Sequence, residues 1–142
     1  MTAFPESHRD LLDVPVAALA TLRADGFPQI TESLVPARRG RAADVAQQLA
    51  AEDAQLRARP QCSIQLLDLS NPDRYLEVRG LGRIEDDPDY VFAARLAAKY
   101  GGLDLSEIDG PGESRVAVTI EPVNVYPVDV GWVLAGEPPP AH

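Results

Sequence analysis

The sequence predicts a mainly β protein in which six short antiparallel strands close into a small barrel with helices on its flank. Three observations support this fold class: the apolar runs are short, turn residues separate them, and few segments have helical spacing. The 142 residues suit a single domain. We expect this domain to span residues 1–132 and a disordered, proline-rich tail to follow over residues 133–142.

The first half of the chain is predicted to contain a helix, a hairpin and a second helix. A short helix over residues 5–13 is followed by strands over residues 16–23 and 29–35. An Asp-Gly pair at 25–26 favours a tight turn between these strands, because glycine accepts a positive φ. Residues 42–59 are rich in Ala, Gln and Glu, with apolar residues at roughly helical spacing, and this pattern predicts one continuous helix.

The second half of the chain is predicted to contain four strands and one helix. The strands cover residues 62–69, 75–84, 114–121 and 123–130. Pro122 is expected to separate the last two, because proline lacks the N–H that a sheet ladder needs. A helix over residues 86–100 and a loop over residues 103–113 lie between the two pairs of strands.

The balance of charges disfavours one class of partner. The chain has 13 basic and 22 acidic residues and a formal net charge of -9, so it has no general attraction for a phosphate backbone. No apolar run approaches the ~18 residues that a membrane-spanning helix needs, and the N-terminus is polar. We therefore expect a cytoplasmic protein whose partners include neither a nucleic acid nor a membrane.

Side chains that catalyse reactions on their own are scarce in this sequence. His8 and His142 lie near the termini, so a Ser-His-Asp or Cys-His arrangement is not expected, and His8 is interpreted as an exposed helix residue. Cys62 is interpreted as a small buried residue within a strand. The sequence has no metal-ligand spacing and no nucleotide-binding glycine pattern. The chain is therefore either a binding protein or an enzyme whose cofactor supplies the chemistry, and its catalytic residues stay unknown.

Three blocks of the sequence resemble a known family. They are Ala-Thr-Leu-Arg-Ala-Asp-Gly-Phe-Pro-Gln over residues 20–29, Leu-Arg-Ala-Arg-Pro-Gln-Cys-Ser over 56–63, and Asn-Pro-Asp-Arg-Tyr-Leu-Glu-Val-Arg-Gly over 71–80. Together they are similar to the pyridoxamine-5'-phosphate-oxidase-like, FMN-binding split β-barrel family, and most similar to its branch that uses the deazaflavin coenzyme F-420. The resemblance implies a six-stranded split barrel and a homodimer with cofactors in grooves at the subunit interface.

The resemblance also implies a function. We expect an oxidoreductase that transfers a hydride between coenzyme F-420 and a small organic substrate. Two alternatives stay open. One is the same fold with FMN as its cofactor, and the other is a non-catalytic or degenerate barrel that acts as a carrier or binds nothing.

The second alternative is based on residues 35–55, where the sequence departs from the family. There the family carries a signature of basic residues that holds the cofactor phosphate, whereas residues 44–54 of this chain contain no basic residue. Each missing charge-assisted contact would weaken cofactor binding by ~1.5–3 kcal/mol. Either this chain has its own variation here, or a compensated double frameshift covers the segment. In favour of the frameshift, a back-translation with GC-rich codons recovers a similar signature when read one nucleotide later.

The resemblance assigns six residues to the cofactor: Gln29, Thr31, Ser33, Arg57, Arg59 and Trp132. The first three alternate along one strand and would face the cofactor ring, unless they form a polar stripe that faces solvent. The two arginines would contact the phosphate, unless they are a solvated pair at a helix end. Trp132 would form a pocket wall across the dimer, unless its role is packing alone.

Arg79 is interpreted as a structural residue in a salt bridge or at the rim of the barrel. Neither a metal ligand nor a general acid is assigned in this sequence.

Overall fold

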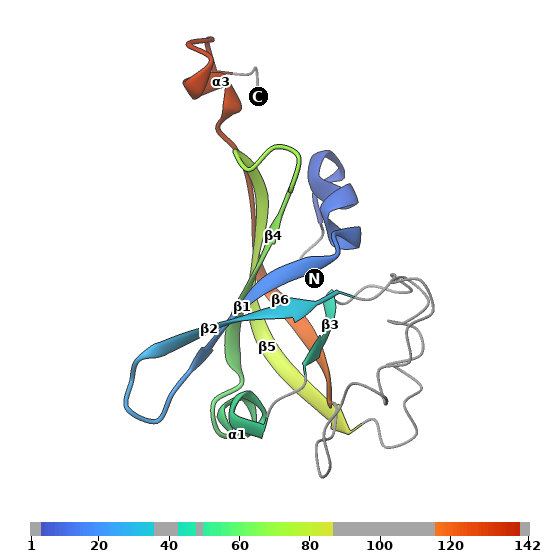
Figure 1. Ribbon diagram of the computed structural model, residues 1–142, viewed down its shortest axis with the longest axis vertical. Coiled ribbons are helices and arrows are strands. Elements are labelled where there is room, and N and C mark those ends of the chain that lie inside the picture. The colour runs from blue at the N-terminus through green and yellow to red at the C-terminus, as the bar shows by residue number, and fades with distance from the viewer. Residues whose placement is uncertain (1–3, 36–42, 48–49, 87–115, 140–142) are drawn as a thin grey trace.

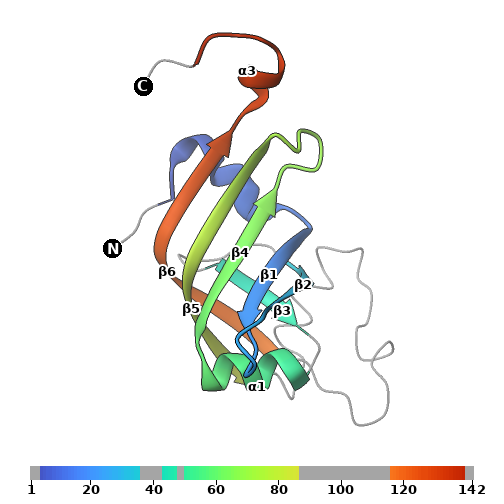
Figure 2. The same ribbon diagram turned by 90° about the vertical axis from the view of Figure 1, so that its left-hand side faces the viewer.

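The computed structural model describes residues 4–35, 43–47, 50–86 and 116–139 (Figures 1 and 2). Its strands are β1 (Val16–Leu22), β2 (Pro28–Leu34), β3 (Ala43–Gln47), β4 (Gln61–Leu67), β5 (Arg74–Asp86) and β6 (Val116–Asp129). Its helices are the 3-10 helix η1 (Glu6–Asp13), α1 (Ala50–Ala58) and α3 (Gly131–Leu134). The strands form a closed barrel in the order β1-β2-β3-β6-β5-β4, and all pairs are antiparallel, so the predicted fold class is confirmed.

The first hairpin follows the sequence prediction closely. Strands β1 and β2 pair over their full lengths, from Val16 opposite Leu34 to Leu22 opposite Pro28. Gly26 has a φ of 85°, and the Asp25 carboxylate accepts a hydrogen bond from the Phe27 N–H at 3.0 Å. The local Asp-Gly chemistry therefore closes the hairpin in the predicted place.

The predicted single helix over residues 42–59 is wrong in its first part. Residues Ala43–Gln47 form β3, and only Ala50–Ala58 form a helix, α1. Five residues of β3 pair with β6, from Ala43 opposite Ile120 to Gln47 opposite Val116. Backbone pairing with a neighbouring strand thus overrides the helix propensity of Ala and Gln in this stretch. The segment that departs from the family signature still supplies a strand of the barrel.

The predicted pair of strands over residues 114–121 and 123–130 is a single strand, β6. Pro122 is accommodated because the pairing of β6 with β3 ends at Ile120, so beyond that point β6 pairs with β5 alone among the described strands. A register shift between Arg79 and Gly80 of β5 lies opposite this proline. The described residues contain six strands, which equals the predicted number, because the sequence prediction lacks β3 and divides β6 into two strands.

Two other predictions concern segments next to, or within, the residues that the structure does not describe. The predicted helix over 86–100 and loop over 103–113 lie outside the described residues, except that residue 86 ends β5. The expected domain boundary after residue 132 falls within α3, and the Glu137 N–H donates a hydrogen bond to the Trp132 carbonyl at 2.8 Å. The division into a domain and a disordered tail stays a prediction.

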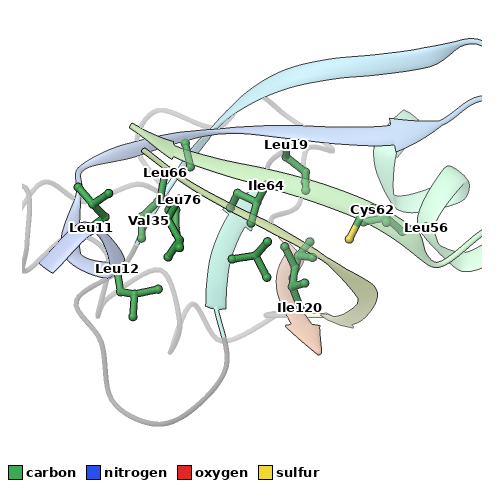
Figure 3. Close-up of a cluster of buried hydrophobic side chains, with 13 residues drawn as sticks. Leu11, Leu12, Leu19, Val35, Leu56, Cys62, Ile64, Leu66, Leu76 and Ile120 are labelled. Carbon is green, nitrogen blue, oxygen red and sulfur yellow. The ribbon is translucent and has the colours of Figure 1, made fainter. Parts of the chain in front are cut away.

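The interior of the barrel is a continuous apolar core (Figure 3). The side chains with no exposed surface are Leu19, Ile64, Leu76, Val78, Val118 and Ile120, which come from four strands. Leu11 and Leu12 of η1 pack at one end of this core, and Leu56 of α1 packs at the other (Figure 3). Helix α1 lies across one end of the barrel and α3 extends beyond the opposite end, as both views show (Figures 1 and 2).

Candidate functional site

A polar network joins α1 to the first hairpin at one end of the barrel. The Thr21 hydroxyl donates a hydrogen bond to the Gln55 amide oxygen at 2.6 Å, and the Gln55 amide nitrogen donates to the Gln29 amide oxygen at 3.1 Å. Thr21 is only 2% exposed, so its hydroxyl has little access to water and needs this partner. The network fixes Gln29 relative to α1, which is also the helix that carries Arg57.

The three β2 residues assigned to the cofactor do share one face, as predicted. Gln29, Thr31 and Ser33 pair with Thr21, Leu19 and Ala17 of β1, whose side chains are buried. Paired residues point to the same side of a sheet, so this face is the interior of the barrel. Ser33 is 3% exposed, and its hydroxyl has no hydrogen-bond partner within the described part of the chain. The alternative of a solvent-facing stripe therefore fails for Ser33, while Gln29 and Thr31 are half-buried.

The two arginines assigned to a phosphate lie beside this network. Arg57 is exposed in the last turn of α1, and Arg59 follows the helix and is half-buried. The Arg59 Nε donates a hydrogen bond to the Leu22 carbonyl at 3.1 Å, which holds its guanidinium against the end of β1. By sequence, α1 has Glu52 and Asp53 in its first half and no cation before Arg57. The positive charge of α1 is thus confined to its C-terminal end.

Trp132 lies in a different place from the other five residues. It belongs to α3, and its indole Nε1 donates a hydrogen bond to the Asp129 carbonyl at 3.0 Å. Helices α3 and α1 are at opposite ends of the barrel (Figures 1 and 2). One chain alone therefore does not bring Trp132 to the arginines or to Gln29.

Sequence reasoning missed a groove on the outer face of the barrel. It has a volume of about 510 Å³ and is formed by β1, the start of β2, β4, β5 and β6. Its lining includes Ala20, Leu22, Pro28, Ser63, Leu81, Val123, Asn124 and Arg79. Two features of the sequence could have indicated this groove. They are the small residues at outward positions of β1 and β4, and the Arg-Gly pair at 79–80. They are weak, because a groove forms only where the sheet brings such positions together.

Arg79 makes the salt bridge that the sequence suggested. Its Nε is 2.7 Å from a carboxylate oxygen of Glu77, and its guanidinium lies 4.4 Å from the centre of the Tyr126 ring. The hydrogen bond from Arg79 to Glu77 raises the pKa of Arg79 above its ordinary value.

The histidine and the cysteine of the described chain are both buried. His8 is 6% exposed rather than exposed as predicted, because its ring bonds to the Val128 carbonyl at 3.1 Å and to the Ser7 hydroxyl at 2.8 Å. Burial raises the pKa of the Cys62 thiol to about 11, which confirms its interpretation as a small buried residue. Within the described ranges, no three His, Cys, Asp or Glu side chains form a group that could hold a metal ion.

The barrel topology and the position of α1 across one end of it define a split-barrel protein. Residues 4–129 match the family model described as pyridoxamine 5'-phosphate oxidase, and the chain belongs to this family. A comparison with curated proteins finds no match.

Solved structures support the same fold. One described as an F420 reductase has 31% sequence identity and a TM-score of 0.72, over 87% of this chain and 98% of that chain. A conserved hypothetical protein from Mycobacterium tuberculosis has 20% identity and a TM-score of 0.70, over 98% of this chain and 92% of that one. A heme binding protein from Mycobacterium smegmatis has 18% identity and a TM-score of 0.61, over 89% of this chain and 55% of that one. The last two likenesses show the fold alone.

No helix among the described residues is long and apolar enough to cross a membrane.

Proposed function

We propose that this protein is an oxidoreductase that transfers a hydride between coenzyme F-420 and a small organic substrate. The observation that carries the proposal is the 31% identity to the F420 reductase over 98% of that chain. Membership of the pyridoxamine 5'-phosphate oxidase family over residues 4–129 supports flavin-type chemistry in the same fold. The other two solved structures described above are 20% and 18% identical to this chain, so they support its fold but not an activity.

The residues at the α1 end of the barrel fit an anionic cofactor through Arg57 and Arg59. Arg59 uses its Nε on the Leu22 carbonyl, and a guanidinium has further N–H donors with which to bind a phosphate oxygen. Gln29 is fixed nearby through Gln55, so it can present its amide in one orientation. The acids in the first half of α1 oppose a phosphate there, so the contact falls to the C-terminal end of the helix.

The chemistry in this proposal comes from the cofactor, which when bound gives or takes a hydride. The residues of the chain bind and orient it. The barrel is filled by side chains with almost no exposed surface, which provides a rigid support for the groups at its rim. We assign no general acid or base, since the only buried titratable side chains among the described residues, His8 and Cys62, have structural roles.

A homodimer is part of the proposal. Trp132 reaches the cofactor only from a second copy, because α3 and α1 lie at opposite ends of one barrel (Figure 1). The partners we propose are therefore a second copy of this chain and a small-molecule substrate. We retain the expectation of a cytoplasmic protein as part of the same proposal.

Two alternatives have support from particular observations. An FMN-dependent enzyme is favoured by the family name, which is that of pyridoxamine 5'-phosphate oxidase. A non-catalytic barrel is favoured by the absence of any basic residue over positions 44–54 of the sequence. In that second case the protein would keep the barrel fold but would bind no cofactor.

Equilibrium titration of the purified protein with coenzyme F-420 and with FMN, followed by absorbance, separates these functions. Tighter binding of F-420 supports the proposal, whereas tighter binding of FMN supports the first alternative. Binding of neither cofactor by a protein with an intact far-ultraviolet circular dichroism spectrum contradicts both enzymes and leaves the non-catalytic barrel.

A further inference from the structure

Helix α3 presents apolar side chains to solvent beyond one end of the barrel (Figures 1 and 2). Val130, Val133 and Leu134 are each at least 40% exposed, and no residue of α3 is buried. The three are spaced three and four residues apart, so they are neighbours on one face. Exposed apolar side chains that gather in one place, rather than singly, indicate a contact surface.

The polar groups around this apolar face are satisfied within the chain. The Trp132 indole Nε1 donates a hydrogen bond to the Asp129 carbonyl at 3.0 Å, and the Gly131 N–H donates to the Asp129 carboxylate at 3.2 Å. The N–H groups of residues 135–137 donate to carbonyls of α3 at 3.0, 3.1 and 2.8 Å, in a turn that Gly136 closes with a φ of 70°. These groups have partners other than water, so α3 can be covered by an apolar surface without leaving them unpaired.

The groove on the outer face of the barrel offers such an apolar surface. Leu22 and Leu81 line it, and each is more than a third exposed. Ala20, which also lines it, pairs with Ile30 of β2, so the exposed Ile30 side chain extends the same face. The volume of about 510 Å³ lies within the ~300–1,000 Å³ of pockets that hold small molecules, so the groove has room for the apolar side chains of α3.

Within a single chain, α3 and the groove stay apart. The groove belongs to the half of the barrel nearer α1, since its lining includes Thr21, which is hydrogen-bonded to Gln55 of α1. Helix α3 lies beyond the opposite end (Figures 1 and 2). Six residues lead from Asn124 in the lining to Val130, which is about 20 Å at the ~3.3 Å rise of a strand. A copy of α3 that fills the groove therefore comes from another chain.

We propose that α3 of each chain docks in the outer-face groove of a second copy, in a two-fold symmetric dimer. A two-fold axis perpendicular to the strands sets two barrels side by side and antiparallel. The α3 end of each then meets the α1 half of the other, so both contacts form at once. The inference rests on the proposed function, because it names the surfaces that form its homodimer and bring Trp132 to the α1 end of the partner.

The charges at the two surfaces permit this contact. Asp129 and Glu137 flank α3, and both are acidic. Among the described residues that line the groove, Arg79 is the one that carries a charge, and it is paired with Glu77. The lining therefore presents no net negative charge to the acids beside α3, although the whole chain has a formal net charge of -9.

The oligomeric state of the full-length protein tests the contact. Sedimentation velocity over a range of concentrations gives the dissociation constant of the dimer. Leu134→Asp should raise this constant about tenfold or more, because it places a charge in an apolar contact. Leu134 is 73% exposed in one chain, so the variant should keep the fold, which its far-ultraviolet circular dichroism spectrum checks.

Leu69→Asp is the matched control for this variant. Leu69 is an apolar residue that is 59% exposed, on the turn between β4 and β5 and outside both α3 and the groove. The substitution adds the same charge and should change the dissociation constant less than about twofold.

The single tryptophan of the chain reports on the same contact. Trp132 is half-buried in one chain, so docking of α3 on a second copy should cover it further. As dilution separates the copies, the fluorescence emission of the wild type should move to longer wavelengths. The same shift should occur in Leu134→Asp at a protein concentration about tenfold or more higher.

A mixture of two variants tests the reciprocal geometry. Leu81→Asp damages the groove as Leu134→Asp damages α3, and each alone spoils both contacts of its own dimer. A mixed dimer joins one intact α3 to one intact groove, while both substitutions fall on the other contact. The equimolar mixture should therefore associate about threefold or more tightly than either variant alone.

Wild-type association of Leu134→Asp, an equal loss in Leu69→Asp, a mixture no tighter than its components, or a wild type that is monomeric at every concentration would overturn the proposal. Titration of the same samples with coenzyme F-420 separates this result from the proposed function. A dimer that depends on Leu134 in a protein that binds no F-420 supports the contact and contradicts the oxidoreductase. A protein that binds F-420, and whose dimer is unaffected by Leu134→Asp, contradicts the contact alone.

Discussion

The Thr21 hydroxyl donates a 2.6 Å hydrogen bond to the Gln55 amide oxygen across 34 residues of sequence. Gln55 in turn donates a hydrogen bond to Gln29, so a single side chain of α1 is hydrogen-bonded to both strands of the first hairpin. This link holds the end of the barrel at which Arg57 and Arg59 lie, the two residues that we propose bind the cofactor.

Breaking this link should destabilise the protein. We predict that Gln55→Ala lowers the free energy of unfolding by about 1–3 kcal/mol, because the buried Thr21 hydroxyl loses its acceptor. Urea denaturation followed by circular dichroism measures this change. In a double-mutant cycle, the effect of Gln55→Ala should be much smaller when Thr21→Val is already present. Additive effects of the two substitutions would contradict the direct hydrogen bond.

The contact of η1 with the barrel should make stability depend on pH. Arg74 binds Asp10 at 2.6 Å and Asp68 at 3.2 Å. Hydrogen bonds from Arg74 lower the pKa of Asp10 below its ordinary value of 3.8, and those from Ser70 and then Arg74 lower that of Asp68. A lowered folded-state pKa gives stability that is complete above the ordinary value and is lost as the pH falls through the folded value.

We therefore expect the wild-type protein to lose stability below about pH 4 more steeply than an Arg74→Met variant does. Urea midpoints measured over that range give the slope. Asp13→Asn, on the same helix and outside the ion-pair cluster, is the control and should keep the wild-type slope. A slope that is equal in wild type and Arg74→Met would show that these ion pairs do not form in solution.

Cys62 gives a test of the core in the native protein. Burial raises the pKa of the Cys62 thiol to about 11, and the residue is only 8% exposed. The thiol should therefore be almost unreactive at about pH 8. We predict that a disulfide reagent labels it at least about a hundredfold faster in denaturant than in buffer. Equal labelling rates in the two conditions would contradict the burial of β4 in the barrel.

The close approach of Gly80 in β5 to the backbone of β6 should be intolerant of any side chain. Gly80→Ala is expected to lower the free energy of unfolding by about 1–3 kcal/mol, because the new Cβ would lie within 2.1 Å of the Glu121 carbonyl oxygen. Thermal and urea unfolding measure this loss. Gly131→Ala provides the comparison, since its nearest neighbour would be at an ordinary 3.5 Å. If both substitutions were equally mild, the register shift beside Gly80 would be wrong.

Local chemistry explains why part of the fold was predictable. The Asp-Gly turn at 25–26 and the alternation in β5 act over a few residues, so they are visible in the sequence. Strand β3 was missed because its residues favour a helix, and only its five pairs with β6 decide otherwise. The sequence predicts a break at Pro122, because nothing in it shows that β6 pairs with β5 alone beyond Ile120 among the described strands.

The candidate site was predictable in part for the same reason. The common face of Gln29, Thr31 and Ser33 follows from alternation alone, whereas the side of the sheet that they occupy depends on barrel closure. The role of Gln55 and the outer groove depend on contacts between distant segments, and no local signal reports them. The frameshift hypothesis for residues 35–55 stays a prediction, and it fails if the sequenced gene contains no nearby pair of insertions or deletions that restores the signature.

Equilibrium titration of coenzyme F-420 into Arg59→Gln tests most directly the proposal that the cofactor binds beside α1. The matched control is Arg23→Gln, which removes an arginine that is 51% exposed and pairs with Asp25 on the hairpin. We predict that Arg59→Gln weakens binding by about 10- to 100-fold, as expected for one charge-assisted hydrogen bond, and that Arg23→Gln leaves it unchanged. Equal affinity of wild type and Arg59→Gln, or no binding by the folded wild-type protein, would contradict the account.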